Sequence, residues 1–405
     1  MSRRLRPSVI AVLLALVLPP VAHEAVAQVA IRGDRVYTMA GDPIERGVVL
    51  IGPDGKIQRV GPAASVPIPD GWRVLEARVV TPGLVDARSV VGLAGYLNQP
   101  HDQMQLDRSA AIQPELRAVD AYDAREALVG WLRQHGITTI HTGHAPGALV
   151  PGQTLIAKTR GDTVDEAVIQ PVATIAATLG TAGLASQGKS PGNRSKAVAM
   201  LRAELIRAKE YVAKMAGPED KRPSRDLRLE ALGRVVRGEL PLLVTAHRSH
   251  DILTALRIAK EFGLRIILDG SSEAYLVTDQ IKEAGVPVIL HATMQRPAGD
   301  AENMSMETAS VLRKAGIPVA IQSGYEGYVP KTRVVLFEAA VAAANGLGFD
   351  AALAAVTIDA ARILGIDKRV GSLEPGKDGD VALFDGDPFE YTSHVTGVVI
   401  DGVVY

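Results

Sequence analysis

The 405-residue sequence predicts an α/β protein: a (β/α)8 barrel of the TIM type carrying a small β-sandwich made from both ends of the chain. Between residues 81 and 368, β-rich segments alternate with helical ones, the pattern of parallel strands joined by helical crossovers. Residues 29–80 and 369–405 instead hold short β-rich runs broken by Gly-Asp, Pro-Asp-Gly and Asp-Gly turns. We therefore expect the two ends to pair with each other beside the central barrel.

The central region contains eight β-rich segments, the strand number of such a barrel. Helical patterns lie between several of them. Over residues 197–215 the apolar side chains share one helix face, with Arg and Lys opposite. Gly263 and Gly316 follow two further helical patterns and are natural helix ends. The eight predicted strands are GLVDARSV, GITTIHTG, QTLIAKT, AVIQPVA, LPLLVTAHR, LRIILDG, VPVILHA and IPVAIQSG.

Composition argues against several classes of partner. Lys and Arg number 44 and Asp and Glu 45, so the net charge of −1 offers nothing to attract nucleic acid or an anionic membrane. Aromatic residues make up only 4%, which also disfavours base stacking. The absence of cysteine removes disulfides, thiol nucleophiles and thiolate metal ligands. A small molecule is the partner we expect.

The first 27 residues read as a cleaved signal peptide. Arg3, Arg4 and Arg6 precede an apolar run over residues 9–21, and small residues follow before Gln28. The run is short for a bilayer span and contains two prolines, so we expect no stable membrane anchor. An uncleaved anchor is the alternative. A cleaved signal predicts a periplasmic or secreted protein.

Three segments resemble one known family. TPGLVDARSVVG, residues 81–92, resembles the first-strand motif of the amidohydrolase superfamily, Pro-Gly-Leu-Ile-Asp-x-His-x-His. Residues 357–388 are similar to the superfamily's C-terminal signature, in which Gly-Ser-Leu-x-Pro-Gly-Lys follows a helix. Residues 246–275 resemble its bacterial secreted, imidazolonepropionase-like branch. The resemblance implies a barrel with a sandwich, a divalent metal that activates water, and hydrolysis of C–N bonds. It also allows a homodimer.

The positions that match the superfamily's metal ligands carry the wrong residues. Two histidines at i and i+2 on a strand project from one face and can share a metal, but those positions hold Arg88 and Val90. Arginine has no lone pair to donate and valine has no polar atom. The later ligand positions align with Thr245, Asp269 and Gly324; a register shift would make His247 the ligand in place of Thr245. We expect no metal at the standard positions, and zinc only through a rearranged site.

Several polar residues at predicted strand ends remain as pocket candidates, because the carboxyl ends of barrel strands share one face. For His141 and His291 the competing interpretation is a neutral imidazole hydrogen-bonded at a strand end. Lys158 fits poorly as a bridging lysine, and Asp269 could instead pair with Arg88 where the metal would lie. The candidates are Arg88, His141, Lys158, His247, Asp269 and His291.

Two functions remain open. The first is hydrolysis of a non-peptide C–N bond, in a cyclic amide or a small acylated amine, with a non-standard or absent metal centre. The second is a catalytically inactive amidohydrolase fold that binds a ligand or serves as a structural partner. The sequence does not decide between them, and whether the protein is an enzyme stays open here.

Overall fold

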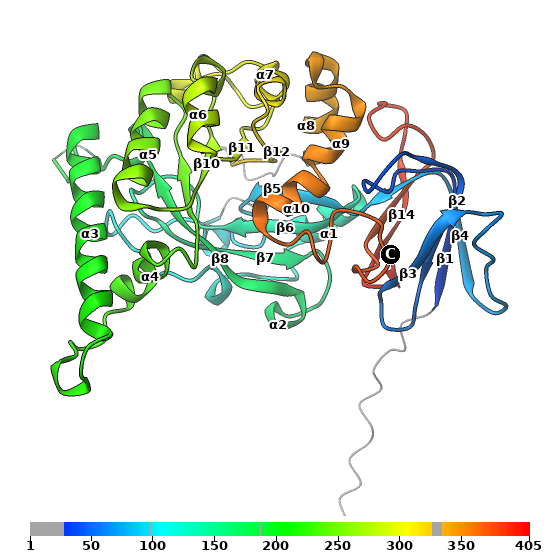
Figure 1. Cartoon of the computed structure of the whole chain (residues 1–405), viewed down its shortest axis with the longest axis horizontal. Helices are drawn as coiled ribbons and strands as arrows, with labels where there is room; N and C mark the ends of the chain where they lie inside the picture. Colours follow the sequence, from blue (N-terminus) through cyan, green and yellow to red (C-terminus); the bar gives the residue numbers. More distant parts are fainter. Residues whose placement is uncertain (1–27, 98, 187, 326–333) are drawn as a thin grey trace, which may run out of the picture.

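A computed structural model describes residues 28–97, 99–186, 188–325 and 334–405. Residues 1–27, where the sequence predicts a signal peptide, lie outside the described residues. Two sheets build the molecule: an eight-stranded barrel sheet covered by helices, and beside it a sheet formed by the two ends of the chain (Figure 1). Within the described part of the chain, none of the helices combines the length and apolarity needed to cross a membrane.

All eight segments expected to be barrel strands are strands, which confirms the predicted barrel. In the sheet each strand lies next to its neighbour in sequence, from β5 to β12. The strands are β5 (Leu84–Ser89), β6 (Ile137–Gly143), β7 (Gly152–Lys158), β8 (Val168–Thr178), β9 (Leu242–Thr245), β10 (Ile266–Gly270), β11 (Val288–Leu290) and β12 (Val319–Ile321).

Strand β7 departs from the expected all-parallel sheet, because it runs antiparallel to both β6 and β8. The reason lies in the connections. A parallel crossover needs a dozen or more residues, usually including a helix. Residues 144–151 join β6 to β7, and residues 159–167, with the single-turn α2 (Val164–Ala167), join β7 to β8. Both links are too short for a crossover, so the chain turns back twice.

The barrel is nearly closed where β5 meets β12. The Gly324 amide donates to the Arg88 carbonyl at 3.2 Å, and the Ser323 amide donates to Asp86 Oδ1 at 3.0 Å. The Ser323 hydroxyl donates to the second oxygen of Asp86. Burial raises the pKa of Asp86 to about 7, although the hydrogen bonds from Ser323 act in the opposite direction. These backbone and side-chain hydrogen bonds join the first and last barrel strands.

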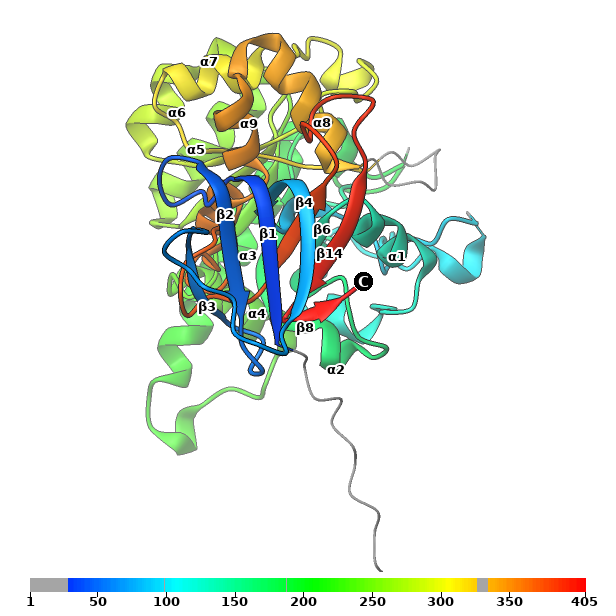
Figure 2. The same cartoon turned by 90° about the vertical axis from the view of Figure 1, so that its right-hand side faces the viewer.

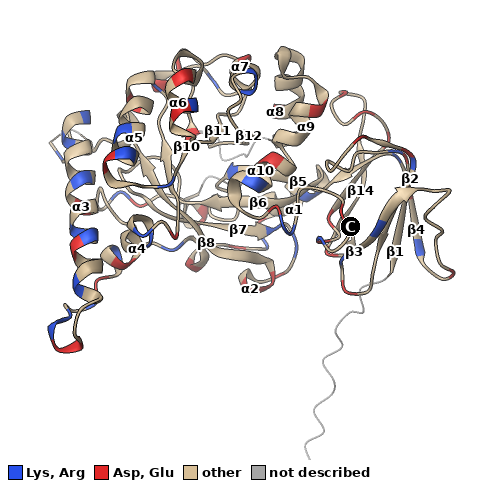
Figure 3. Ribbon diagram, in the orientation of Figure 1, with Lys and Arg blue, Asp and Glu red and all other residues tan. Residues whose placement is uncertain are grey.

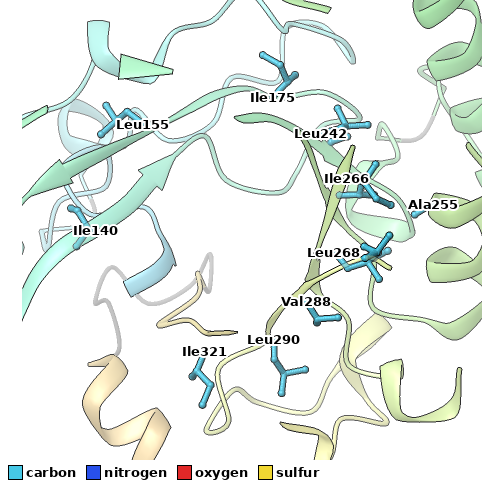
Figure 4. Close-up of a cluster of buried hydrophobic side chains, with 14 of the residues drawn as sticks. Ile140, Leu155, Ile175, Leu242, Ala255, Ile266, Leu268, Val288, Leu290 and Ile321 are labelled. Atoms are coloured by element: carbon cyan, nitrogen blue, oxygen red, sulfur yellow. The ribbon is translucent and has the colours of Figure 1, made fainter. Parts of the chain in front are cut away.

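Two hydrophobic layers follow from the pleat of the strands, in which successive side chains point to opposite faces. The outer layer packs against the surrounding helices, among them α5 (Ser249–Phe262), whose Ala255 lies against strand side chains in Figure 4. The inner layer fills the barrel and meets α10 (Ile358–Leu364). Its strand members are Val85, Ala87, Ile156, Ala173, Leu243, Ile267, Ile289 and Ala320.

Helices cover the outside of the barrel. The pattern predicted over residues 197–215 lies within α3, which buries Leu201 and Leu205. Gly263 ends α5 in the left-handed conformation, with φ 68°, as its position predicted. Charges of both signs are mixed along α3, α4 and α6 (Figure 3). Besides α2 and α10, the described α-helices are α1 (Ala127–Gln134), α3 (Arg194–Met215), α4 (Leu227–Val236), α5 (Ser249–Phe262), α6 (Thr278–Ala284), α7 (Thr308–Lys314), α8 (Val335–Ala342) and α9 (Phe349–Ala355).

The two ends of the chain pair as the sequence predicted. They form one continuous seven-stranded sheet, in the order β15-β14-β13-β4-β1-β2-β3, rather than two separate ladders (Figure 2). The join is the antiparallel pairing of β13 with β4. The strands are β1 (Val29–Val36), β2 (Ile44–Ile51), β3 (Ile57–Pro62), β4 (Arg73–Pro82), β13 (Val381–Phe384), β14 (Val395–Ile400) and β15 (Val403–Val404).

Candidate functional site

A small cavity lies at the carboxyl ends of the barrel strands, where active sites of this fold occur. Its volume is about 40 Å³, room for about three water molecules. Most of its polar lining lies two residues beyond an inner-layer side chain and therefore on the same strand face. Polar residues that line the cavity are Arg88, Ser89, Thr245, His247, Asp269, His291, Gln295, Gln322 and Tyr325.

Arg88 is held by backbone oxygens. Its side chain is 3% exposed. Nη1 donates to the Ser89 carbonyl at 3.0 Å and Nη2 donates to the His144 carbonyl, while Nε has no hydrogen-bond partner in residues 28–325 and 334–405 as far as they are described. Burial lowers the pKa of Arg88, and the charges of Asp269 and Asp86 act against that shift. The guanidinium is thus fixed at the cavity with donors to spare.

Asp269 does not pair with Arg88 as we expected. No contact within 4.0 Å joins the two side chains among the described ion pairs. The Asp269 carboxylate is engaged by neutral donors instead: Gln322 Nε2 at 2.8 Å on Oδ1 and the Thr245 hydroxyl on Oδ2. Both donors lie at the ends of strands in the same sheet and reach the carboxylate directly, whereas the Arg88 guanidinium lies beyond ion-pair distance. The predicted ion pair is therefore wrong.

His247 and His291 both line the cavity as neutral imidazoles. Nδ1 of His247 lies 2.8 Å from the Ser272 hydroxyl, and burial lowers the pKa of this histidine. Nδ1 of His291 lies 2.8 Å from the Ala292 carbonyl. Because a carbonyl only accepts, Nδ1 of His291 carries the proton and Nε2 carries a lone pair. That Nε2 is buried with no hydrogen-bond partner among the described residues, and burial lowers the pKa of His291 to about 4.

The position of His247 depends on a glycine. Gly270 has φ +76°, and a Cβ there would lie 2.7 Å from Cε1 of His247. The imidazole therefore packs directly on the glycine backbone. A side chain at residue 270 would be strained by its own backbone and would displace the ring.

His141 is a structural residue rather than a cavity residue. It lies inside the barrel at 0% exposure. Its Nδ1 donates to the Ala87 carbonyl and its Nε2 accepts from the Thr154 hydroxyl, both at 2.7 Å. Burial lowers its pKa to about 3, with the charge of Arg88 adding to the effect. Both ring nitrogens are satisfied, so the structural interpretation of His141 is the one that fits.

Lys158 lies at the opposite end of the barrel, so the expectation that it lines the pocket is wrong. It pairs with Thr139, near the beginning of β6, because β7 runs antiparallel. Its ammonium contacts Asp378 at 2.9 Å, Asp401 at 3.1 Å, and Asp380. These aspartates belong to the C-terminal segment that builds the terminal sheet. Lys158 therefore ties the barrel to that sheet.

Gln322 is a cavity residue that the sequence analysis did not single out. It follows β12 and donates both to Asp269 and, at 3.1 Å, to the Ile289 carbonyl. Its spacing of two from the inner-layer Ala320 would have placed it on the inner face. Glutamine does not titrate and is seldom a general base or nucleophile, so this spacing did not mark Gln322 as a candidate.

The donor set does not fit a divalent metal at the standard positions. Val90 and Gly324 offer no side-chain donor, Arg88 brings a permanent positive charge, and Thr245 is hydrogen-bonded to the carboxylate. Only Asp269 among the five is a common ligand type. Across the described stretches of the chain, no three His, Cys, Asp or Glu side chains gather closely enough to hold a metal ion.

Comparisons with known proteins agree with the fold. Residues 331–405 match the model described as Amidohydrolase family. Imidazolonepropionase of Rhizorhabdus wittichii (strain DSM 6014 / CCUG 31198 / JCM 15750 / NBRC 105917 / EY 4224 / RW1) is 27% identical over 386 residues, covering 87% of this chain and 92% of that protein. Amidohydrolase tasK of Hapsidospora irregularis is 30% identical over 201 residues, 46% of this chain but only 19% of that protein.

A solved structure resembles nearly the whole chain. The amidohydrolase from Thermotoga maritima MSB8 superposes with a TM-score of 0.87 at 27% identity, covering 93% of this chain and 99% of its own. A prolidase complexed with N-methylphosphonate-L-proline has a TM-score of 0.58 at 17% identity and shows the fold alone. On the barrel, the terminal sheet and these similarities, the chain belongs to the amidohydrolase superfamily.

Proposed function

We propose that the protein hydrolyses a non-peptide C–N bond of a small molecule, in a cyclic amide or a small acylated amine, without a metal at the superfamily's standard positions. One observation carries the proposal: the neutral imidazole of His291, whose Nε2 has no partner in the part of the chain that the structure describes, lines the same cavity as the buried cation of Arg88. A base and a positive charge are the two groups that water attack on a carbonyl needs. The likeness to a relative named imidazolonepropionase supports the substrate class.

Each group has a role in this reaction. The lone pair on His291 Nε2 accepts a proton from the attacking water and returns it to the leaving nitrogen as the C–N bond breaks, and Arg88 donates to the carbonyl oxygen as negative charge develops there. A pKa of about 4 keeps His291 unprotonated at neutral pH but makes it a weak base. Weak general-base assistance suits a ring-strained or activated C–N bond. This favours a strained or electronically activated cyclic amide over an unstrained acylated amine.

The setting is part of the same proposal. We infer a small-molecule substrate, no nucleic-acid partner and no stable membrane anchor, with the mature chain acting in the periplasm or outside the cell after loss of residues 1–27. A homodimer is compatible with it. Sedimentation analysis and N-terminal sequencing of secreted protein test these points.

The test is turnover by the purified full chain. Lactams, imidazolones and small N-acyl amines are incubated with it, and the acid and amine products are followed by mass spectrometry beside a measurement of bound metal. We expect turnover of at least one cyclic amide, lowered about 100-fold or more by His291→Ala, but not by His394→Ala, whose side chain is 76% exposed. Absence of turnover across the panel would remove the hydrolase proposal, and turnover that requires stoichiometric metal would remove the mechanism.

The second candidate is a binding protein with the same fold and no catalysis. The observation in its favour is that four of the five standard metal positions, Arg88, Val90, Thr245 and Gly324, carry no common metal ligand. A small molecule that raises the melting temperature, remains intact, and loses its effect when a cavity residue is changed would support this candidate.

A further inference from the structure

Arg88 is a buried cation that touches no carboxylate among the residues that the structure describes. The two acidic groups whose charges act on Arg88 are occupied by other donors: Asp86 by Ser323 and by the Arg88 backbone amide, and Asp269 by Gln322 and Thr245. Their charges act on Arg88 only from beyond ion-pair distance. An uncompensated buried charge is costly in free energy, so a negatively charged partner would stabilise this guanidinium.

The guanidinium also has free donors. It carries five N–H groups, of which the carbonyls of Ser89 and His144 engage two, one on each terminal nitrogen. Nε has no acceptor within the described segments of the chain. These two backbone bonds hold the group in place, so its planar fork is already oriented before any ligand arrives.

We propose that Arg88 binds a carboxylate in the cavity at the carboxyl ends of β5, β9, β10, β11 and β12. A carboxylate matches the guanidinium in charge, planarity and donor spacing, and two parallel N–H to oxygen bonds join such pairs. Arg88 stands at the first histidine of the superfamily's metal-binding motif. The guanidinium of Arg88 thus places a positive charge where the family's motif would bind a metal cation.

The source of the carboxylate follows from the proposed function, on which this step alone rests. Hydrolysis of an amide adds water across the C–N bond and gives a carboxylate and a protonated amine, R–CO–NHR′ + H2O → R–COO⁻ + R′–NH3⁺; in a cyclic amide R and R′ are linked, so one product carries both groups. The carboxylate product then binds Arg88, and the reaction shows product inhibition. Without hydrolysis, the same site binds a carboxylate ligand supplied from elsewhere.

Acetate is the probe, and acetamide is its neutral analogue of nearly the same shape. Isothermal titration of the full chain should show acetate binding and no matching affinity for acetamide. Arg88→Gln should weaken acetate binding about tenfold or more, the effect of losing a charge-assisted hydrogen bond. Arg257→Gln, on the exposed face of α5, should leave it unchanged.

Outcomes that overturn the proposal are equally definite. Equal binding of acetate and acetamide, no acetate binding, or undiminished binding by Arg88→Gln would each do so. If Arg88→Gln fails to fold, a crystal structure of the unaltered chain grown with acetate decides, since acetate must lie against the guanidinium of Arg88. Acetate binding without turnover keeps this inference and removes the hydrolase proposal. Turnover without carboxylate binding does the reverse.

Discussion

Replacing Lys158 with methionine should destabilise the protein strongly, because it removes the ammonium that joins the barrel to the terminal sheet. Lys158 is 1% exposed and Asp380 is 3% exposed. Asp378 keeps Arg369, at 2.9 Å, and Lys56 as partners, whereas Asp380 loses its only described cation. Breaking a buried ion pair by removing one partner costs about 3–5 kcal/mol. We expect Lys158→Met to lower the free energy of unfolding by that amount at pH 8.

The loss should shrink at lower pH. Burial raises the pKa of Asp380 even with Lys158 present, and Lys158 opposes that rise. Without the lysine the pKa of Asp380 rises further above its unfolded value. A carboxyl whose folded pKa is raised stabilises the fold when protonated and loses that contribution as pH rises. The deficit of Lys158→Met should therefore be smaller at pH 5 than at pH 8.

Urea unfolding followed by circular dichroism measures the effect. Adding Asp380→Asn to Lys158→Met should restore much of the lost stability, because no uncompensated carboxylate then remains. Lys56→Met is the matched control: its side chain is 41% exposed and it should cost about 1 kcal/mol or less. A loss below about 1 kcal/mol for Lys158→Met, or no rescue by Asp380→Asn, would refute the reasoning.

Three further predictions follow from the barrel. Burial raises the pKa of Asp86 to about 7, above its unfolded value near 3.8. The stability that the Asp86 carboxyl contributes is therefore complete below its unfolded pKa and is lost as pH rises through 7, a change of roughly 4 kcal/mol in the free energy of unfolding. Asp86→Asn should abolish this pH dependence in unfolding curves measured between pH 4 and 8. Gly270→Ala should cost about 1–2 kcal/mol through its left-handed backbone and displace the His247 ring, and a variant as stable as the original would contradict the packing described. Dialysis against a chelator should change neither turnover nor melting temperature, whereas a loss that added zinc reverses would show a functional metal.

The sequence predicted the fold well because strand patterns are local. An inward-facing and an outward-facing side chain alternate along each strand, and that alternation can be read without knowing any neighbour. The pairing of the two ends followed from their shared β-rich texture. The direction of β7 was missed, although residues 144–151 and 159–167 are too short for crossovers and carried the signal.

The site was predicted less well because partners across the barrel are far apart in sequence. Of the six candidates, Arg88, His247, Asp269 and His291 line one cavity, whereas His141 and Lys158 do not. The sequence could not show that His141 has both nitrogens satisfied while His291 has one. Those differences depend on Thr154 and Ala292, whose contacts exist only in the folded chain.

By itself, the sequence determined that this chain has the superfamily's barrel and that its first strand lacks the two metal-binding histidines, since strand periodicity and ligand chemistry are properties of the residues themselves. Only the tertiary structure decided what replaced them. Arg88 is fixed by the carbonyls of Ser89 and His144 and not by Asp269. The physical reason is that a buried charge takes whichever acceptors the surrounding strands bring within hydrogen-bond distance, and the sequence alone does not give those distances.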